Sequence, residues 1–171
     1  MIHPHTELKF ISPAKGFGVV ATELIPKGTI TWVLDPLDQV FSPQKIRKLD
    51  PVFREIIYTY SYRDKNGDFV LCWDHSRFIN HSFHSNCLST AYNFELAVRD
   101  IFPGEELTDD YGYLNLTEPF NCLREEGTLR EQALPDDLLH FYPKWDSQLM
   151  EAFKYFNLVD QTLQAMIEQE S

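Results

Sequence analysis

The sequence is poor in cysteine, in positive charge and in long hydrophobic runs. Its three cysteines are an odd number without repeated close spacing, which argues against a disulfide framework. A reducing, intracellular setting is therefore expected, with the cytoplasm as the default compartment. No apolar run approaches the roughly 20 residues of a membrane span, and residues 1–5 do not resemble a signal peptide. We predict no membrane association.

Positive charge is scarce along most of the chain. Fifteen Lys and Arg face twenty-six Asp and Glu, a net charge of −11, and residues 61–171 hold twenty of the acids but only eight of the basic residues. A nucleic-acid partner would need a basic face, so direct nucleic-acid binding is not expected. The acidic surface either only keeps the chain soluble or also steers a Lys/Arg-rich protein segment toward a site.

Long helical patterns are missing before residue 130, whereas prolines number ten in 171 residues. This combination predicts many short strands and turns rather than a helical bundle. The length fits one domain with its own core. Strands are expected at residues 7–12, 69–73 and 95–99, with turns at 64–67 and 103–104.

Helices are expected in two places. Ser42 and Pro43 predict the N-cap and first position of a short helix over residues 44–49. Pro135 and the two acids after it predict the start of a later helix. Residues 146–168 are expected to be helical as well, because apolar residues recur there at helical spacing.

Two polar segments hold the candidate functional residues. Residues 77–82 read R-F-I-N-H-S, and residues 104–113 read G-E-E-L-T-D-D-Y-G-Y. The first is too rich in Asn, His and Ser for a helix interior, and the second follows a Pro-Gly turn. Both fall at the ends of expected elements, where sites are usually built.

These segments resemble the two signature motifs of SET-domain protein-lysine methyltransferases, and Asn86 matches the last position of that family's first motif. The resemblance covers about residues 8–142. It implies a mainly β fold with α, the β-clip or SET fold, in which several short sheets surround a knot-like loop arrangement and helices follow at the C-terminus. It also implies a SET domain over residues 1–118, with a degenerate post-SET segment and C-terminal helices over 119–171.

The resemblance implies S-adenosyl-L-methionine as cofactor and a protein substrate with an accessible lysine, in a basic segment. It leaves the oligomeric state open. A G-x-G at residues 16–18 suits a hairpin turn, and in the family the backbone there approaches the cofactor. The cofactor-binding residues implied are Lys15, Gly16, Phe17, Gly18, Arg77, Asn80, His81, Tyr111, Phe120 and Leu123.

Three tyrosines are candidates for the chemistry. Tyr111 matches the family's near-invariant tyrosine, whose hydroxyl would contact the transferring methyl group. Tyr58, Tyr60 and Tyr62 alternate, which predicts one face of a strand. A tyrosine of such a strand orients the substrate amine in the family. Tyr60 is the first choice and Tyr62 the second, since the spacing does not decide, and the other two of the three would belong to an aromatic core stripe. No side chain needs to be a dedicated base.

Metal ligation is not expected. The resemblance points to a cysteine-rich zinc tail after Tyr113, yet only Cys122 stands there, and one thiolate cannot close a tetrahedral zinc site. The upstream set lacks paired ligand spacing and gives no zinc site either; it consists of Cys72, His75, His81, His84 and Cys87.

Several positions depart from the family pattern. Phe83 and Ser85 replace its usual Cys and Pro, and Asp109 stands where many members have Phe or Tyr. A carboxylate facing the amine would favour the charged lysine, so Asp109 either points away or indicates altered chemistry. The degree of methylation stays open. The alternative function is a catalytically weak SET-fold module that binds a basic peptide or protein partner.

Overall fold

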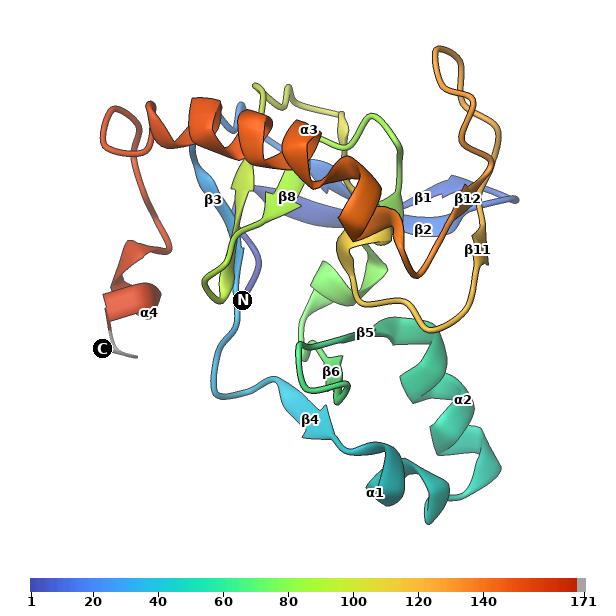
Figure 1. The fold of residues 1–171 in the computed structure, drawn as a ribbon. Helices are drawn as coiled ribbons and strands as arrows, with labels where there is room; N and C mark the ends of the chain where they lie inside the picture. The colour runs from blue at the N-terminus through green and yellow to red at the C-terminus, as the bar shows by residue number, and fades with distance from the viewer. Residues whose placement is uncertain (169–171) are drawn as a thin grey trace.

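The protein consists mainly of short β-sheets, with helices at its periphery (Figure 1). This computed structural model describes residues 1–168. Four sheets lie within those residues. The first sheet contains β1 (Thr6–Ser12), β2 (Gly16–Ala21), β10 (Glu106–Asp109) and β7 (Asn80–His81), and the second contains β3 (Ile30–Val33), β9 (Phe94–Ala97) and β8 (Cys87–Ser89). The third sheet contains β4 (Gln39–Phe41), β6 (Phe69–Leu71) and β5 (Ser61–Arg63). The fourth contains β11 (Phe120–Asn121) and β12 (Gln132–Ala133). The predicted mainly β fold with C-terminal helices is confirmed.

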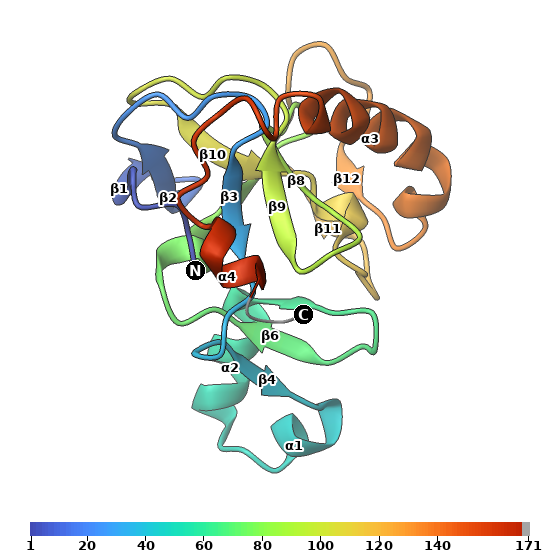
Figure 2. The same ribbon diagram turned by 90° about the vertical axis from the view of Figure 1, so that its left-hand side faces the viewer.

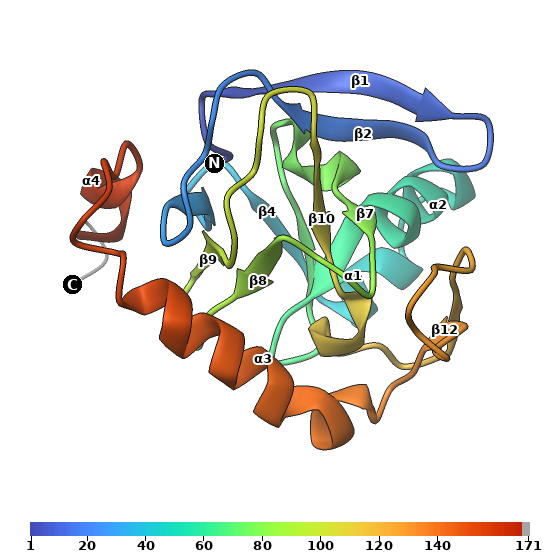
Figure 3. The same ribbon diagram turned by 90° about the horizontal axis from the view of Figure 1, so that it is seen from above.

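The first sheet brings the two motif segments together. β1 and β2 form an antiparallel hairpin, and β10 pairs antiparallel with β2 and parallel with β7. Figure 3 shows β10 beside β7 near the centre of the molecule. The Asn86 side chain, almost fully buried, accepts a hydrogen bond from the Thr108 amide (2.9 Å) and donates one to the Glu106 carbonyl (2.8 Å). Asn86 therefore fixes the second motif beside the first.

The second sheet carries the largest part of the core. Leu88 and Leu96 are buried in it and pack in one cluster with Trp145 and Ala152 of α3 (Asp137–Phe153). Figure 2 shows α3 beside the ends of β8 and β9, and α4 (Gln164–Glu168) beside β3. The helix expected over residues 146–168 is wrong as a single element, because α3 ends at Phe153. The chain then turns back onto β3, where the Gln161 side chain accepts a hydrogen bond from the Ile30 amide (2.9 Å).

The third sheet forms a lower lobe with α1 (Pro43–Arg47) and α2 (Pro51–Tyr60) (Figure 1). The predicted Ser42 cap is confirmed: its hydroxyl accepts a hydrogen bond from the Lys45 amide (3.2 Å). The strand expected through the three tyrosines is wrong. Asp50 accepts from the Val52 amide (3.1 Å) and starts a helix that runs through Tyr60.

This correction changes the surroundings of the tyrosines. Tyr58 and Tyr60 lie on α2 and are 54% and 38% exposed, so they are not part of a core stripe. Only Tyr62 lies on a strand, β5, where its ring contacts Trp32 edge-on. The sequence signal was the Asp50-Pro51 pair, which favours a helix start more strongly than three alternating tyrosines favour a strand.

The other predicted strands and turns are confirmed within one or two residues. The turn over residues 64–67 closes the β5–β6 hairpin, with the Gly67 amide donating to the Asp64 carbonyl (3.0 Å). The turn at residues 103–104 precedes β10, and Gly104 has a positive φ of 85°. No helix among residues 1–168 combines the length and the apolar character needed to cross a membrane.

Candidate functional site

A polar cluster lies where β2, β7 and β10 meet. The Asn80 side-chain amide donates to the Phe17 carbonyl (3.0 Å) and to Glu106 Oε1 (2.7 Å). Lys15 Nζ forms an ion pair with Glu106 Oε2 (2.8 Å). Two predicted cofactor residues, Lys15 and Asn80, therefore bind Glu106 directly. Sequence reasoning missed Glu106 as a site residue, although it is the second acid of the motif that singled out this segment.

Gly18 is required by this cluster. A Cβ at Gly18 would lie 2.5 Å from Glu106 Oε1 and 2.9 Å from Asn80 Nδ2. The structure thus explains this glycine by the close approach of two polar side chains of the protein itself. Gly16 has a different reason: its φ of +75° in the hairpin turn disfavours any residue with a Cβ.

His81 connects the two motif segments through its ring. The Tyr111 amide donates to His81 Nδ1 (3.0 Å), so the ring proton of the neutral histidine resides on Nε2. Burial lowers the pKa of His81 and favours that neutral form. Nε2 is buried and has no hydrogen-bond partner among residues 1–168. A buried donor without an acceptor costs about 1–3 kcal/mol of stability. Binding of a ligand that brings an acceptor to Nε2 would remove this cost.

Tyr111 begins η2 (Tyr111–Tyr113), directly after β10. Its hydroxyl donates to the Ile79 carbonyl (2.7 Å), which follows η1 (His75–Phe78). Burial raises the pKa of this hydroxyl well above its usual range, so it keeps its proton. Its ring centroid lies 5.1 Å from that of Phe120. Tyr111, in the second motif segment, is thus held by two residues of the first, and its hydroxyl oxygen is fixed in place.

A pocket of about 640 Å³ extends from Tyr111 toward the lower lobe. Tyr60 and Tyr62 both line it, together with Arg77 and Phe120. Tyr60 rests on Phe78 with ring centroids 5.2 Å apart, and Tyr62 is the more buried of the two tyrosines. Although Tyr60 lies on α2 and not on a strand, it still lines the pocket, because α2 ends there.

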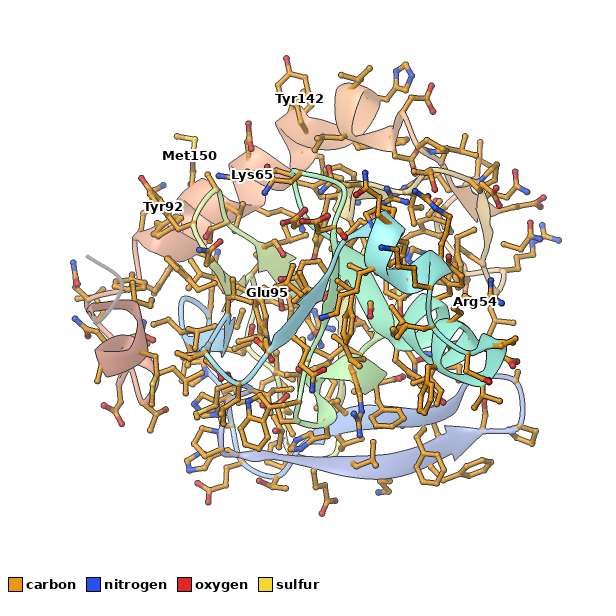
Figure 4. All side chains as sticks on the ribbon, turned by 90° about the horizontal axis from the view of Figure 1, so that it is seen from below. Arg54, Lys65, Tyr92, Glu95, Tyr142 and Met150 are labelled. Atoms are coloured by element: carbon orange, nitrogen blue, oxygen red, sulfur yellow. The ribbon has the colours of Figure 1, made fainter. Side chains whose placement is uncertain are left out.

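Two acidic side chains, Glu95 and Asp109, belong to the same pocket although each is only 6% exposed. Figure 4 shows Glu95 among the crowded side chains at the molecule's centre. Glu95 Oε1 accepts from the Ser89 hydroxyl (2.9 Å). Asp109 thus does not point away from the pocket. Glu95 was expected only as the start of a strand; the missed signal was one acid inside an otherwise apolar run, F-E-L-A-V.

The two carboxyl groups interact with each other. Burial raises the pKa of Glu95 to about 7, and burial together with the charge of Glu95 raises the pKa of Asp109 well above its usual range. Glu95 Oε2 and Asp109 Oδ1 are buried oxygens that make no hydrogen bond of ordinary geometry among the described residues, although the Tyr113 hydroxyl lies beside Asp109. A proton held between the carboxyls satisfies both oxygens, because two carboxylates in contact cannot both ionise easily.

The segment after η2 is anchored by Arg130. Its guanidinium binds Asp110 and Asp137 and stacks on the rings of Phe83 (4.3 Å) and Phe141 (4.2 Å). This network ties the residues around β11 and β12 to the chain beside Tyr111 and so holds Phe120 near the pocket. Sequence reasoning missed Arg130, because its partners lie on separate elements.

The remaining predicted cofactor residues are less closely joined to this centre. Arg77 stacks on Phe78 at 5.3 Å, in the pocket wall. The side chains of Phe17, Phe120 and Leu123 are all more than two-fifths exposed and present apolar surface.

In the described part of the chain, no group of three or more His, Cys, Asp and Glu side chains is arranged to hold a metal ion.

Comparison with known proteins gives one family. The family model described as the SET domain matches residues 16–112, which include the first motif segment, the second as far as Gly112, and both Glu95 and Asp109. A search of curated proteins gives no match. The match extends over more than half of the 171 residues.

Proposed function

Because the chain belongs to the SET-domain family, we propose that it is an S-adenosyl-L-methionine-dependent N-methyltransferase acting on lysine side chains of a protein. One observation carries the proposal. An aromatic-walled pocket ends beside Tyr111, whose amide and hydroxyl bind the first motif segment. A lysine side chain is long, apolar along its stem and cationic at its tip, which suits such a pocket.

The residues present fit the cofactor. His81 Nε2 is a buried donor without a protein partner among residues 1–168. Lys15 and Glu106 carry one charge of each sign. The zwitterionic amino-acid end of the cofactor also carries one of each, so the charges can match. The exposed faces of Phe120 and Leu123 offer apolar cover for a base. When bound, S-adenosylmethionine supplies an electrophilic methyl group.

The protein's own contribution is alignment and exclusion of water. Holding an amine in line with a methyl donor replaces a bimolecular encounter by a near-attack arrangement. The Ile79 carbonyl fixes the Tyr111 hydroxyl, and the pocket tyrosines enclose the lysine stem. Tyr62 is more buried than Tyr60. We therefore assign amine orientation to Tyr62 and contact with the stem nearer the entrance to Tyr60.

The substrate class follows from charge. The chain carries a net charge of −11, which attracts a Lys/Arg-rich segment of a partner protein and repels an acidic one. A lysine within a basic segment is the expected target.

The test is transfer of a labelled methyl group. The full chain is incubated with methyl-labelled S-adenosylmethionine and the proteins of a cell lysate, and labelled proteins are located by mass spectrometry. Mono-, di- or trimethyllysine on one or a few proteins is expected. Label absent from every lysine, while the protein stays folded and binds the cofactor, contradicts the proposal.

The second candidate is a SET-fold module that binds a basic peptide without turnover. Asp109 and Glu95 favour it, because a charged carboxylate near the amine stabilises the unreactive ammonium. Binding of a basic protein without labelling in the same experiment would support this alternative.

A further inference from the structure

The buried acids of the pocket have no task in the alignment described so far. Glu95 lies on β9 and Asp109 on β10, so two different sheets deliver one carboxyl each to the same place. Burying two acids in contact is costly, and a core of this size has no need of them. Their position in the lining of the substrate pocket provides a reason for their presence.

We propose that the Glu95–Asp109 pair accepts the proton of the substrate ammonium group and so produces the neutral amine that attacks the methyl group. The proposal rests on the proposed function and assigns to these two residues the role of proton acceptor in it. Three features support it: both residues line the pocket, both are more than nine-tenths buried, and each has a buried oxygen that makes no hydrogen bond of ordinary geometry among the described residues.

The protons balance as follows. Above about pH 7 the pair holds one shared proton and one negative charge. The substrate ammonium gives one proton to the pair, which leaves a neutral amine and two carboxyl groups. The nitrogen lone pair forms the new C–N bond while the C–S bond of the methyl donor breaks. The pair then releases its second proton to solvent and returns to its singly protonated state.

The surroundings allow this cycle. The titratable and charged groups that face the pair are Tyr62, Cys87, Asp110, Tyr111, Tyr113 and the N-terminal amine of Met1. Burial raises the pKa of Cys87, Tyr111 and Tyr113, so these groups stay neutral. The positive amine of Met1 favours a single negative charge on the pair. A proton acceptor that titrates near the working pH is the efficient kind.

The contribution of the pair to the transfer rate depends on pH. When the pH falls through about 7, the pair takes up its second proton from solvent and can no longer accept one from the substrate. At high pH, near the reference lysine pKa of about 10.4, the amine is already neutral and needs no acceptor. The contribution of the pair is therefore largest near neutrality and vanishes toward pH 10.

The first measurement is a pH profile of the transfer rate. Its substrate is the acceptor protein found by labelling, used at saturating cofactor. The double variant Glu95→Gln/Asp109→Asn keeps both volumes but cannot accept a proton. Its rate should fall ~10²–10⁴-fold at pH 7, and the loss should shrink toward pH 10. Asp146→Asn, which removes an exposed acid on α3, is the control and should match the unaltered protein.

A second measurement needs neither cofactor nor turnover. Carboxyl ¹³C resonances of the labelled protein are followed during a pH titration and assigned with the single variants Glu95→Gln and Asp109→Asn. Titration of the pair well above the usual acid range is expected. If the double variant does not fold, the single variants also provide the rate test, because each should move the acidic limb of the profile.

The possible outcomes separate the two proposals. An active protein whose rate and profile are unchanged in these variants overturns the role of the pair and leaves the methyltransferase standing. Carboxyls that both titrate in the usual acid range overturn it as well. A folded protein that labels no lysine overturns the methyltransferase and, with it, this role.

Discussion

At the scale of single residues, Tyr111 illustrates how one hydroxyl contributes to both fold and chemistry. Its hydrogen bond to the Ile79 carbonyl ties the second motif segment to the first. The same bond fixes the hydroxyl oxygen at the pocket. A purely structural tyrosine and a catalytic one therefore make the same contact, and only the pattern of losses on mutation separates them.

Tyr111→Phe is expected to show both losses. Leaving the Ile79 carbonyl without its donor should lower the free energy of unfolding by about 1–3 kcal/mol. If the hydroxyl also acts in the transition state, kcat should fall ~10²–10³-fold while cofactor affinity hardly changes. Thermal unfolding, calorimetry and single-turnover labelling measure the three quantities. Full transfer by folded Tyr111→Phe would show that the role is structural only.

Asn80 should behave differently. Asn80→Ala removes two hydrogen bonds, to Phe17 and Glu106, from the polar cluster of the proposed cofactor site. We expect weaker binding of S-adenosylmethionine and of its demethylated product before any effect on the transfer step. Calorimetry with both compounds gives the affinities. An absence of heat at millimolar ligand with the folded, unaltered protein would exclude the cofactor site itself.

At the scale of elements, the β1–β2 hairpin allows the two glycines to be compared. Gly18→Ala places a methyl group 2.5 Å from Glu106 Oε1 and disrupts the hydrogen bond between Glu106 and Asn80. The free energy of unfolding should therefore fall by about 1–3 kcal/mol, and cofactor binding should weaken. Gly16→Ala meets open space and bears only the positive φ. It should therefore destabilise the hairpin without changing cofactor affinity, as denaturant titration and calorimetry would show.

Many of the strands, turns and helix starts could be predicted from the sequence, because local signals determine them. The turn residues at 64–67 and 103–104 and the Ser42 cap all act over a few positions, and all were predicted correctly. The errors arose where two local signals competed. Alternating tyrosines favoured a strand, but the Asp50-Pro51 start extended a helix through Tyr60. The late apolar spacing favoured one helix, but the chain turned back onto β3 after Phe153.

At the scale of the whole molecule, the unpredicted features are those that require distant segments to meet. Glu95 and Asp109 are ordinary acids in the sequence and become a pair only because two sheets bring them to one pocket. Arg130 likewise finds Asp110 and Asp137 only after the chain has folded. The motif residues could be predicted to lie together because the family resemblance contains that long-range information, which no local pattern does.

The expected absence of a zinc tail leads to a last prediction, which concerns the stability of the whole chain. Cys72 and Cys87 are buried in the core, where burial raises their pKa and disfavours the thiolate that binds metal. Cys122 lies on another segment, whose anchor is the Arg130 network. A strong chelator should therefore leave the melting temperature and methyl transfer unchanged, whereas Arg130→Met should lower the free energy of unfolding by about 3–5 kcal/mol by leaving buried acids unpaired. Metal analysis that finds one tightly held zinc per chain would contradict this account, because the segment would then be held by metal rather than by the arginine.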